Sequence, residues 1–134
     1  MRSSNIFITI ITISLLFFFS CSSSKEKMFA KEAEEQDRLC PMMIDNYTRA
    51  DSIRYTTADN TFHYYYTLMG DADNTDVANQ KRKELQEQLP VEIKQATGLT
   101  IHRNNRVVME YIYFSDRSGS ELFRVVITPD MYLK

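Results

Sequence analysis

Two runs of β-forming residues restrict the fold of this chain more than any other feature. Residues 61–69 and residues 106–114 are rich in aromatic and β-branched side chains. Such runs predict strands, in which successive side chains point to opposite faces. One face of the first strand would carry Phe62, Tyr64, Tyr66 and Leu68, and one face of the second would carry Val107, Met109, Tyr111 and Tyr113.

Each of these strands has a partner next to it in the sequence. Residues 52–57 alternate in the same way and reach residue 61 through Ala58-Asp59-Asn60, which suits a tight turn. Residues 121–128 follow the second strand after a turn at 115–119, and Pro129 ends them. The sequence therefore predicts two hairpins.

Helical patterns precede each hairpin. Residues 26–39 contain no Gly or Pro and consist of helix-forming residues. A second helix is expected from Asp76, where Asp73 or Thr75 can cap it, to Gly98; Pro90 should kink or restart it. Its apolar face would consist of Val77, Leu85, Leu89, Ile93 and Ala96. Residues 41–50 show no periodicity and are expected to be irregular.

These elements predict the α+β class, with the order helix–hairpin–helix–hairpin. Strands joined by short turns pair antiparallel, so we expect a four-stranded antiparallel sheet with the helices on one face. Residues 26–134 would form a single domain, large enough for one core.

The first twenty residues have the pattern of a secretory signal peptide: Arg2, an apolar run over residues 6–19, and the small residue Ser20. A membrane-spanning helix is the alternative. A helical run of this length would reach only about 21 Å, short of the ~30 Å hydrocarbon core, which favours the signal peptide.

The segment Phe18-Phe19-Ser20-Cys21 resembles the lipobox of bacterial lipoproteins, with Phe18 where Leu is usual. The resemblance implies that Cys21 is lipid-modified and becomes the first residue of the mature chain, anchored to the membrane and tethered by residues 21–25. The residue after Cys21 is Ser22 and not Asp. By resemblance to the sorting of bacterial lipoproteins, this implies the outer membrane. The alternative is an ordinary secretory signal in which Cys21 has no role.

Charge and cysteine content limit the possible partners. The formal net charge is −2, and loss of Arg2 with the signal peptide makes the mature chain one unit more negative. This disfavours nucleic acid and anionic lipid surfaces as partners.

Cys40 would be the one remaining thiol, and its apolar neighbours predict a buried, structural residue without a nearby base.

The segment from Pro41 to Ile53, with Asp45, Thr48-Arg49 and Asp51-Ser52, precedes the strand segment Tyr64-Tyr65-Tyr66-Thr67. Together these resemble small exported bacterial proteins of unassigned function, over roughly residues 35–130. The resemblance implies the same fold but no activity, and the cysteine pair that many of these proteins carry is absent here.

The Asp45–Asp51 stretch can be read as a turn, in which Asp45, Thr48 and Asp51 accept backbone hydrogen bonds and Arg49 pairs with an aspartate. It can also be read as a site for a small polar ligand, and Ser52 as a glycosylation acceptor.

The sequence contains no recognisable catalytic set. His63 and His102 are far apart in sequence and lack the clustered ligands that a metal site requires. No nucleophile triad or glycine-rich phosphate loop is present. We therefore expect no metal, no cofactor and no enzymatic activity.

Three functions remain open. The first is a lipid-anchored, non-enzymatic binding module of the cell envelope. The second is an immunity or inhibitor protein that neutralises a toxin or enzyme, and the third is an enzyme of unknown class. For the first, a protein-binding patch on the outward sheet face is expected from Tyr65 with Tyr111, Tyr113 or both, because tyrosine is enriched at interfaces. The alternative is that these tyrosines only pack as cross-strand pairs.

Overall fold

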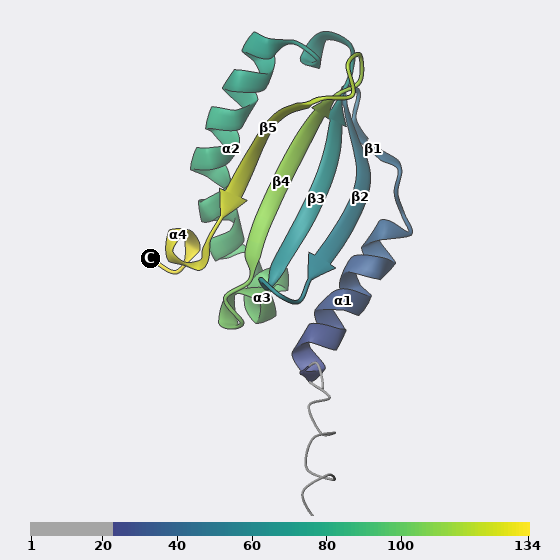
Figure 1. Cartoon of the computed structure of the whole chain (residues 1–134). Coiled ribbons are helices and arrows are strands. Elements are labelled where there is room, and N and C mark those ends of the chain that lie inside the picture. The colour runs from purple at the N-terminus through teal and green to yellow at the C-terminus, as the bar shows by residue number, and fades with distance from the viewer. Residues whose placement is uncertain (1–22) are drawn as a thin grey trace, which may run out of the picture.

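The computed structural model describes residues 23–134, so that the predicted signal peptide and Cys21 lie outside the described residues. The chain folds into a five-stranded sheet with helices (Figure 1). The elements in chain order are α1 (Ser24–Asp37), β1 (Met42–Asp45), β2 (Thr48–Thr56), β3 (Thr61–Leu68), η1 (Gly70–Ala72), α2 (Thr75–Gln95), η2 (Thr97–Leu99), α3 (Thr100–Asn104), β4 (Val108–Ser115), β5 (Glu121–Ile127) and α4 (Pro129–Tyr132).

The predicted α+β class and the two hairpins are confirmed, but the predicted four-stranded antiparallel sheet is wrong. The strands lie in the order β1-β2-β3-β4-β5, and β3 pairs with β4 in parallel. The other neighbouring strands pair antiparallel. The sheet is therefore mixed.

The parallel pair follows from the long connection between the two hairpins. Residues 69–107 contain α2 and α3, and they carry the chain back across the sheet before β4 begins. A connection of a dozen or more residues through a helix allows parallel pairing, which a tight turn cannot. Short turns fix only the pairing within each hairpin.

The fifth strand lies where the sequence predicts irregular structure. β1 pairs with β2 at the edge of the sheet, with Met42 opposite Ala50 and Met43 opposite Arg49. All four residues of β1 are exposed, so the strand has no buried face and no alternation of polar and apolar residues to reveal it. Its register also shifts between Met43 and Asp45.

The two long helices begin with side-chain caps. Ser23 accepts a hydrogen bond from the backbone N–H of Glu26, and the Glu26 carboxylate accepts one from Ser23 in return. This capping box starts α1 at Ser24, inside the predicted tether of residues 21–25. In α2, Asn74 caps the first turn, and the helix continues through Pro90 for 21 residues without restarting.

The core lies between the helices and one face of the sheet, as predicted. Phe29 of α1 and Ile93 of α2 share a buried cluster with the strand residues that point to the same side, among them Phe62, Leu68, Met109, Val125 and Ile127. None of the described helices is both long and apolar enough to cross a bilayer.

Candidate functional site

Four tyrosines form an array at the centre of the sheet face that the helices cover. The register of β3 and β4 places Tyr64 beside Tyr111 and Tyr66 beside Tyr113. The ring centroids of each pair lie 4.9 Å apart, and the rings are stacked. Stacked aromatic pairs stabilise a fold by ~0.5–1.5 kcal/mol each beyond the area they bury. We call these four residues the tyrosine floor.

The helices cover the tyrosine floor only in part. α1 packs on β2 and α2 packs on β5. The two helices therefore cover the same face of the sheet near its opposite edges (Figure 1). Tyr64, Tyr66 and Tyr111 are consequently half-buried although they point toward the helix layer. By contrast, Phe62 on the same face of β3 is fully buried, because the rings of Phe29 and His102 pack against it.

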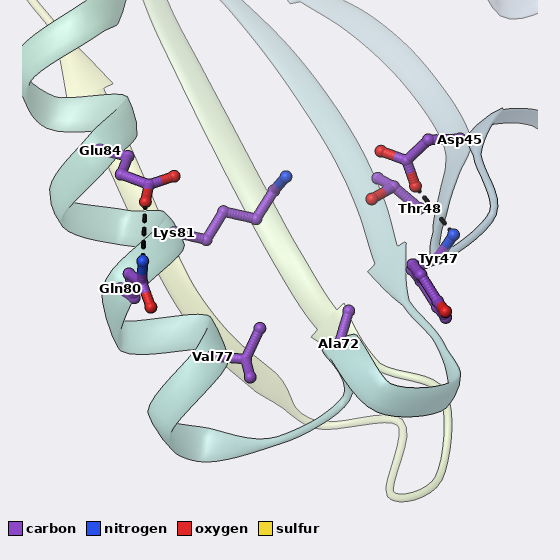
Figure 2. Close-up of a pocket in the computed structure, with 8 residues that line it drawn as sticks. All are labelled: Asp45, Tyr47, Thr48, Ala72, Val77, Gln80, Lys81 and Glu84. Carbon is purple, nitrogen blue, oxygen red and sulfur yellow. Dashed lines mark hydrogen bonds between the residues drawn. The ribbon is translucent and has the colours of Figure 1, made fainter.

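A pocket of about 280 Å³ adjoins the tyrosine floor, between the end of β1 and the first half of α2. Figure 2 shows Asp45 and Tyr47 on one side and Lys81 and Glu84 on the other. The Nζ atom of Lys81 lies 5.7 Å from the ring centroid of Tyr113, which links the pocket to the floor. The pocket is lined by Asp45, Tyr47, Thr48, Ala72, Val77, Gln80, Lys81 and Glu84. We call the floor and the pocket together the tyrosine groove.

Asp45 is held in place by the turn that joins β1 to β2. Its Oδ1 atom accepts a hydrogen bond of 2.8 Å from the backbone N–H of Tyr47. This bond lowers the pKa of the Asp45 carboxyl, and the Thr48 hydroxyl and the charge of Lys81 lower it further. Asp45 therefore presents a negative charge to the groove at neutral pH.

The tyrosine hydroxyls of the floor remain protonated at neutral pH. Burial raises the pKa of all four, to about 12 for Tyr66. The carboxylates of Glu32, Glu92 and Asp45 add to the rise at Tyr64, Tyr111 and Tyr113 respectively. The floor is thus an uncharged aromatic surface with hydroxyl groups, a combination suited to binding.

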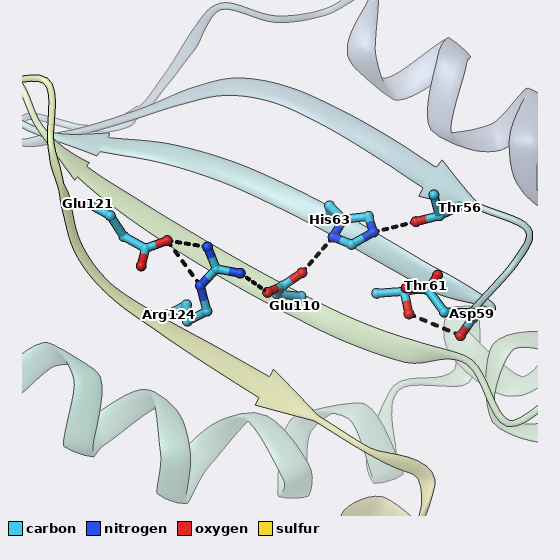
Figure 3. A network of polar contacts seen from close by, with 7 residues as sticks. All are labelled: Thr56, Asp59, Thr61, His63, Glu110, Glu121 and Arg124. Carbon is cyan, nitrogen blue, oxygen red and sulfur yellow. Dashed lines mark hydrogen bonds and ion pairs between the residues drawn. The ribbon is translucent and has the colours of Figure 1, made fainter.

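On the opposite face of the sheet no helix of residues 23–134 packs, and His63, Glu110, Glu121 and Arg124 contact one another there (Figure 3). Glu110 accepts a hydrogen bond from Arg124 at 2.5 Å, and its other oxygen lies 2.6 Å from Nδ1 of His63. Glu121 and Thr56 extend the chain of contacts at its two ends. We call this side the open face, and its paired charges make it a weaker candidate site than the groove.

The structure does not bring the three predicted binding tyrosines together. Tyr65 lies on the open face, where its ring stacks beside His63 and Phe114. Tyr111 and Tyr113 lie on the helix-covered face, so the expected outward patch of Tyr65 with Tyr111, Tyr113 or both is wrong. Since Tyr65 is opposite Ile112 in the register, the outward set on β4 is Glu110 and Ile112.

The remaining candidate residues take structural positions. Cys40 is half-buried rather than buried, with its Sγ 3.8 Å from the carbonyl oxygen of Gln36. Arg49 pairs with Asp51 at 2.6 Å as expected, but both lie in β2, so the predicted turn over Asp45–Asp51 is limited to the residues before Thr48. Ser52 is half-buried within β2.

The two histidines lie apart, and each contacts a glutamate. His63 contacts Glu110, and His102 lies 3.0 Å from Glu32. Within residues 23–134 no three His, Cys, Asp or Glu side chains gather in a way that could hold a metal ion.

Sequence reasoning missed Tyr64, Tyr66 and Lys81 as site residues. The alternation along residues 61–69 places both tyrosines on the core-facing side, and a core position suggests packing alone. The pairing of β3 with β4 brings the rings together, and only the packing of the helices in three dimensions leaves them partly exposed. Lys81 gives no signal in sequence, because a lysine on a helix is usually solvent-exposed.

Comparison with known proteins shows a family and a fold. The profile of the family described as "Domain of unknown function (DUF8479)" matches residues 23–123. A search of curated proteins gave no match.

Two solved structures share the fold. A Pseudomonas aeruginosa protein described as secreted aligns with a TM-score of 0.66 at 13% identity, over 83% of this chain and 95% of that chain. The pilotin EpsS of the Vibrio vulnificus type 2 secretion system aligns with a TM-score of 0.53 at 16% identity, over 83% of this chain and 94% of its own. At these identities the likeness concerns the fold.

Proposed function

The chain belongs to the family described as "Domain of unknown function (DUF8479)", and on that premise we propose that it is a lipid-anchored protein of the cell envelope. In this proposal it binds a protein partner in the tyrosine groove and catalyses no reaction. Anchoring rests on the signal pattern of residues 1–20 and on Cys21.

One observation carries the proposal: the helix layer leaves three aromatic rings partly exposed at the edge of the core, where full helix cover would bury them. Tyr64, Tyr66 and Tyr111 point toward the helices and are only partly covered by them. A rigid ring with a polar tip loses little conformational entropy on binding, and such residues dominate binding energy at many interfaces. A partner segment lying over the floor would bury this surface.

The fold likeness supports the same function. One of the two aligned structures is a pilotin of a type 2 secretion system, and the other is described as secreted. A place in the cell envelope and a protein partner are consistent with both.

Two neighbouring residues allow a direct test, because Tyr66 lies in the groove and Tyr65 lies on the open face. A photo-crosslinking amino acid is placed at either position in the full-length protein, which is expressed in its own envelope and irradiated. We expect one defined protein adduct from position 66 and none from position 65.

Equal adducts from both positions, or none from position 66, would contradict the proposal. A variant that fails to fold is recognised by its circular dichroism spectrum. In that case crosslinking from Lys81→Cys with a thiol-reactive photoprobe replaces it, because Lys81 lines the same groove from α2.

A further inference from the structure

Carboxylates from α1, β1 and α2 lie near the tyrosine groove, and two of them, Asp45 and Glu84, line its pocket. Glu32 extends from α1, Asp45 from β1, and Glu84 and Glu92 from α2. Glu32, Asp45 and Glu92 lie close enough to the floor to raise the pKa of its hydroxyls. Glu84 lines the adjoining pocket. The rim of the groove is therefore acidic.

Most of these carboxylates lack an ionic partner. Among residues 23–134 the ion pairs involve none of Asp45, Glu84 and Glu92. Glu32 is the exception, because it lies 3.0 Å from His102. On the open face, by contrast, Glu110 and Glu121 are paired with Arg124. Unpaired negative charge thus collects at the groove.

Lys81 shows how a cation fits this surface. It is the one cationic residue in the pocket lining, and its Nζ lies 5.7 Å from the ring centroid of Tyr113. A cation at this distance is attracted by the electrons of the ring. Asp45 lies on the other side of the pocket (Figure 2), and the charge of Lys81 helps to lower its pKa. The rings of Tyr64, Tyr66 and Tyr111 have no such cation of their own within the described residues.

Apolar surface at the same place shows that a small cation alone would fill the groove poorly. Tyr47 and Val77 line the pocket with exposed fractions of 46% and 43%. We infer that the tyrosine groove takes a protein segment in which lysine or arginine side chains alternate with apolar ones. The cations would lie between the carboxylates and the ring faces, and the apolar side chains would cover Tyr47 and Val77. This inference rests on the proposed function.

The test uses three labelled synthetic peptides of equal length, made of Lys and Leu, Gln and Leu, or Glu and Leu. Their binding to residues 22–134, which contain the whole described domain, is followed by fluorescence anisotropy. We expect the Lys/Leu peptide to bind about tenfold more tightly than the Gln/Leu peptide and the Glu/Leu peptide not to bind. The preference should weaken with added salt, which screens exposed charges.

Paired variants separate the groove from the net charge of the protein. Asp45→Asn with Glu92→Gln should weaken Lys/Leu binding about fivefold, since each exposed charge pair contributes only modestly to binding. Asp59→Asn with Glu87→Gln removes the same charge from exposed positions outside the pocket lining and should leave binding unchanged.

Each other outcome overturns the inference. These outcomes are equal binding of the Lys/Leu and Gln/Leu peptides, equal loss in both paired variants, no binding of any peptide, and binding of spermidine as tight as that of the Lys/Leu peptide. The crosslinking experiment at positions 65 and 66 does not depend on peptide charge. A groove that crosslinks in the envelope but prefers the Gln/Leu peptide would keep the proposed function and refute only the charge preference.

Discussion

At the scale of single residues, Cys40 shows how position controls the reactivity of a thiol. It follows α1 by three residues and is half-buried beside Gln36. Burial raises the pKa of this thiol, and the negative charges of Asp37 and Asp51 raise it further. The thiolate is the reactive form, so these neighbours make Cys40 a poor nucleophile at neutral pH.

This predicts a slow reaction with a thiol reagent such as dithionitrobenzoate. The experiment uses a Cys21→Ser chain without residues 1–20, in which Cys40 is the one thiol. At pH 7.4 Cys40 should react at least about tenfold more slowly in the folded protein than in guanidinium chloride. Raising the pH should speed the folded-state reaction, because it increases the thiolate fraction. A folded-state rate equal to the unfolded-state rate at pH 7.4 would count against this protection.

At the scale of elements, α2 tolerates a proline that the sequence predicts will disturb it. Pro90 has no N–H to donate to the carbonyl of Gln86, and its ring crowds that turn. The helix nevertheless continues through it, because Leu89 and Ile93 on either side are buried in the core. Tertiary packing therefore overrides the local cost of the proline.

We expect Pro90→Ala to stabilise the protein by about 1–2 kcal/mol, because it restores the missing helix hydrogen bond. Urea unfolding followed by circular dichroism measures the change.

The matched control is Pro129→Ala at the first position of α4, where proline suits the helix. That change should have no stabilising effect, and should cost up to about 1 kcal/mol through the unfolded chain. An unstable Pro90→Ala variant would show that the ring packs in a way that compensates for the lost bond.

At the scale of the whole molecule, the domain begins directly after the predicted lipid attachment site. α1 starts at Ser24, three residues after Cys21. The described helices include none suited to crossing a bilayer. In the proposed function the lipid at Cys21 anchors the domain, and two acyl chains suffice for stable anchoring where one does not.

Radiolabelled palmitate should enter the wild-type protein and not the Cys21→Ala variant. The variant should also leave the membrane fraction, since the remaining chain carries a net negative charge that disfavours anionic lipid surfaces. A Ser22→Ala variant serves as the control and should be labelled like the wild type. Equal label in the Cys21→Ala variant would exclude lipidation at this residue.

The sequence by itself determined the local structure. Period-two alternation predicts β2 to β5, because a half-buried strand must alternate its side chains. Short turns fix the antiparallel pairing inside each hairpin. Helix-forming composition predicts α1, and a helical apolar stripe predicts α2, to within a few residues. It also placed Tyr64 and Tyr66 on the same face of β3 as Phe62 and Leu68, which the structure confirms.

Only the tertiary structure decided how these parts combine. The parallel contact of β3 with β4 depends on where α2 carries the chain, and no local pattern in the sequence encodes that path. β1 is exposed throughout and lacks the alternation that would reveal it. The tyrosine groove exists because α1 and α2 pack near opposite edges of the same sheet face, which leaves Tyr66 and Tyr111 half-covered. Tyr65 points to the other face. A side chain's face can be read from its neighbours in sequence, but its exposure depends on what packs above it.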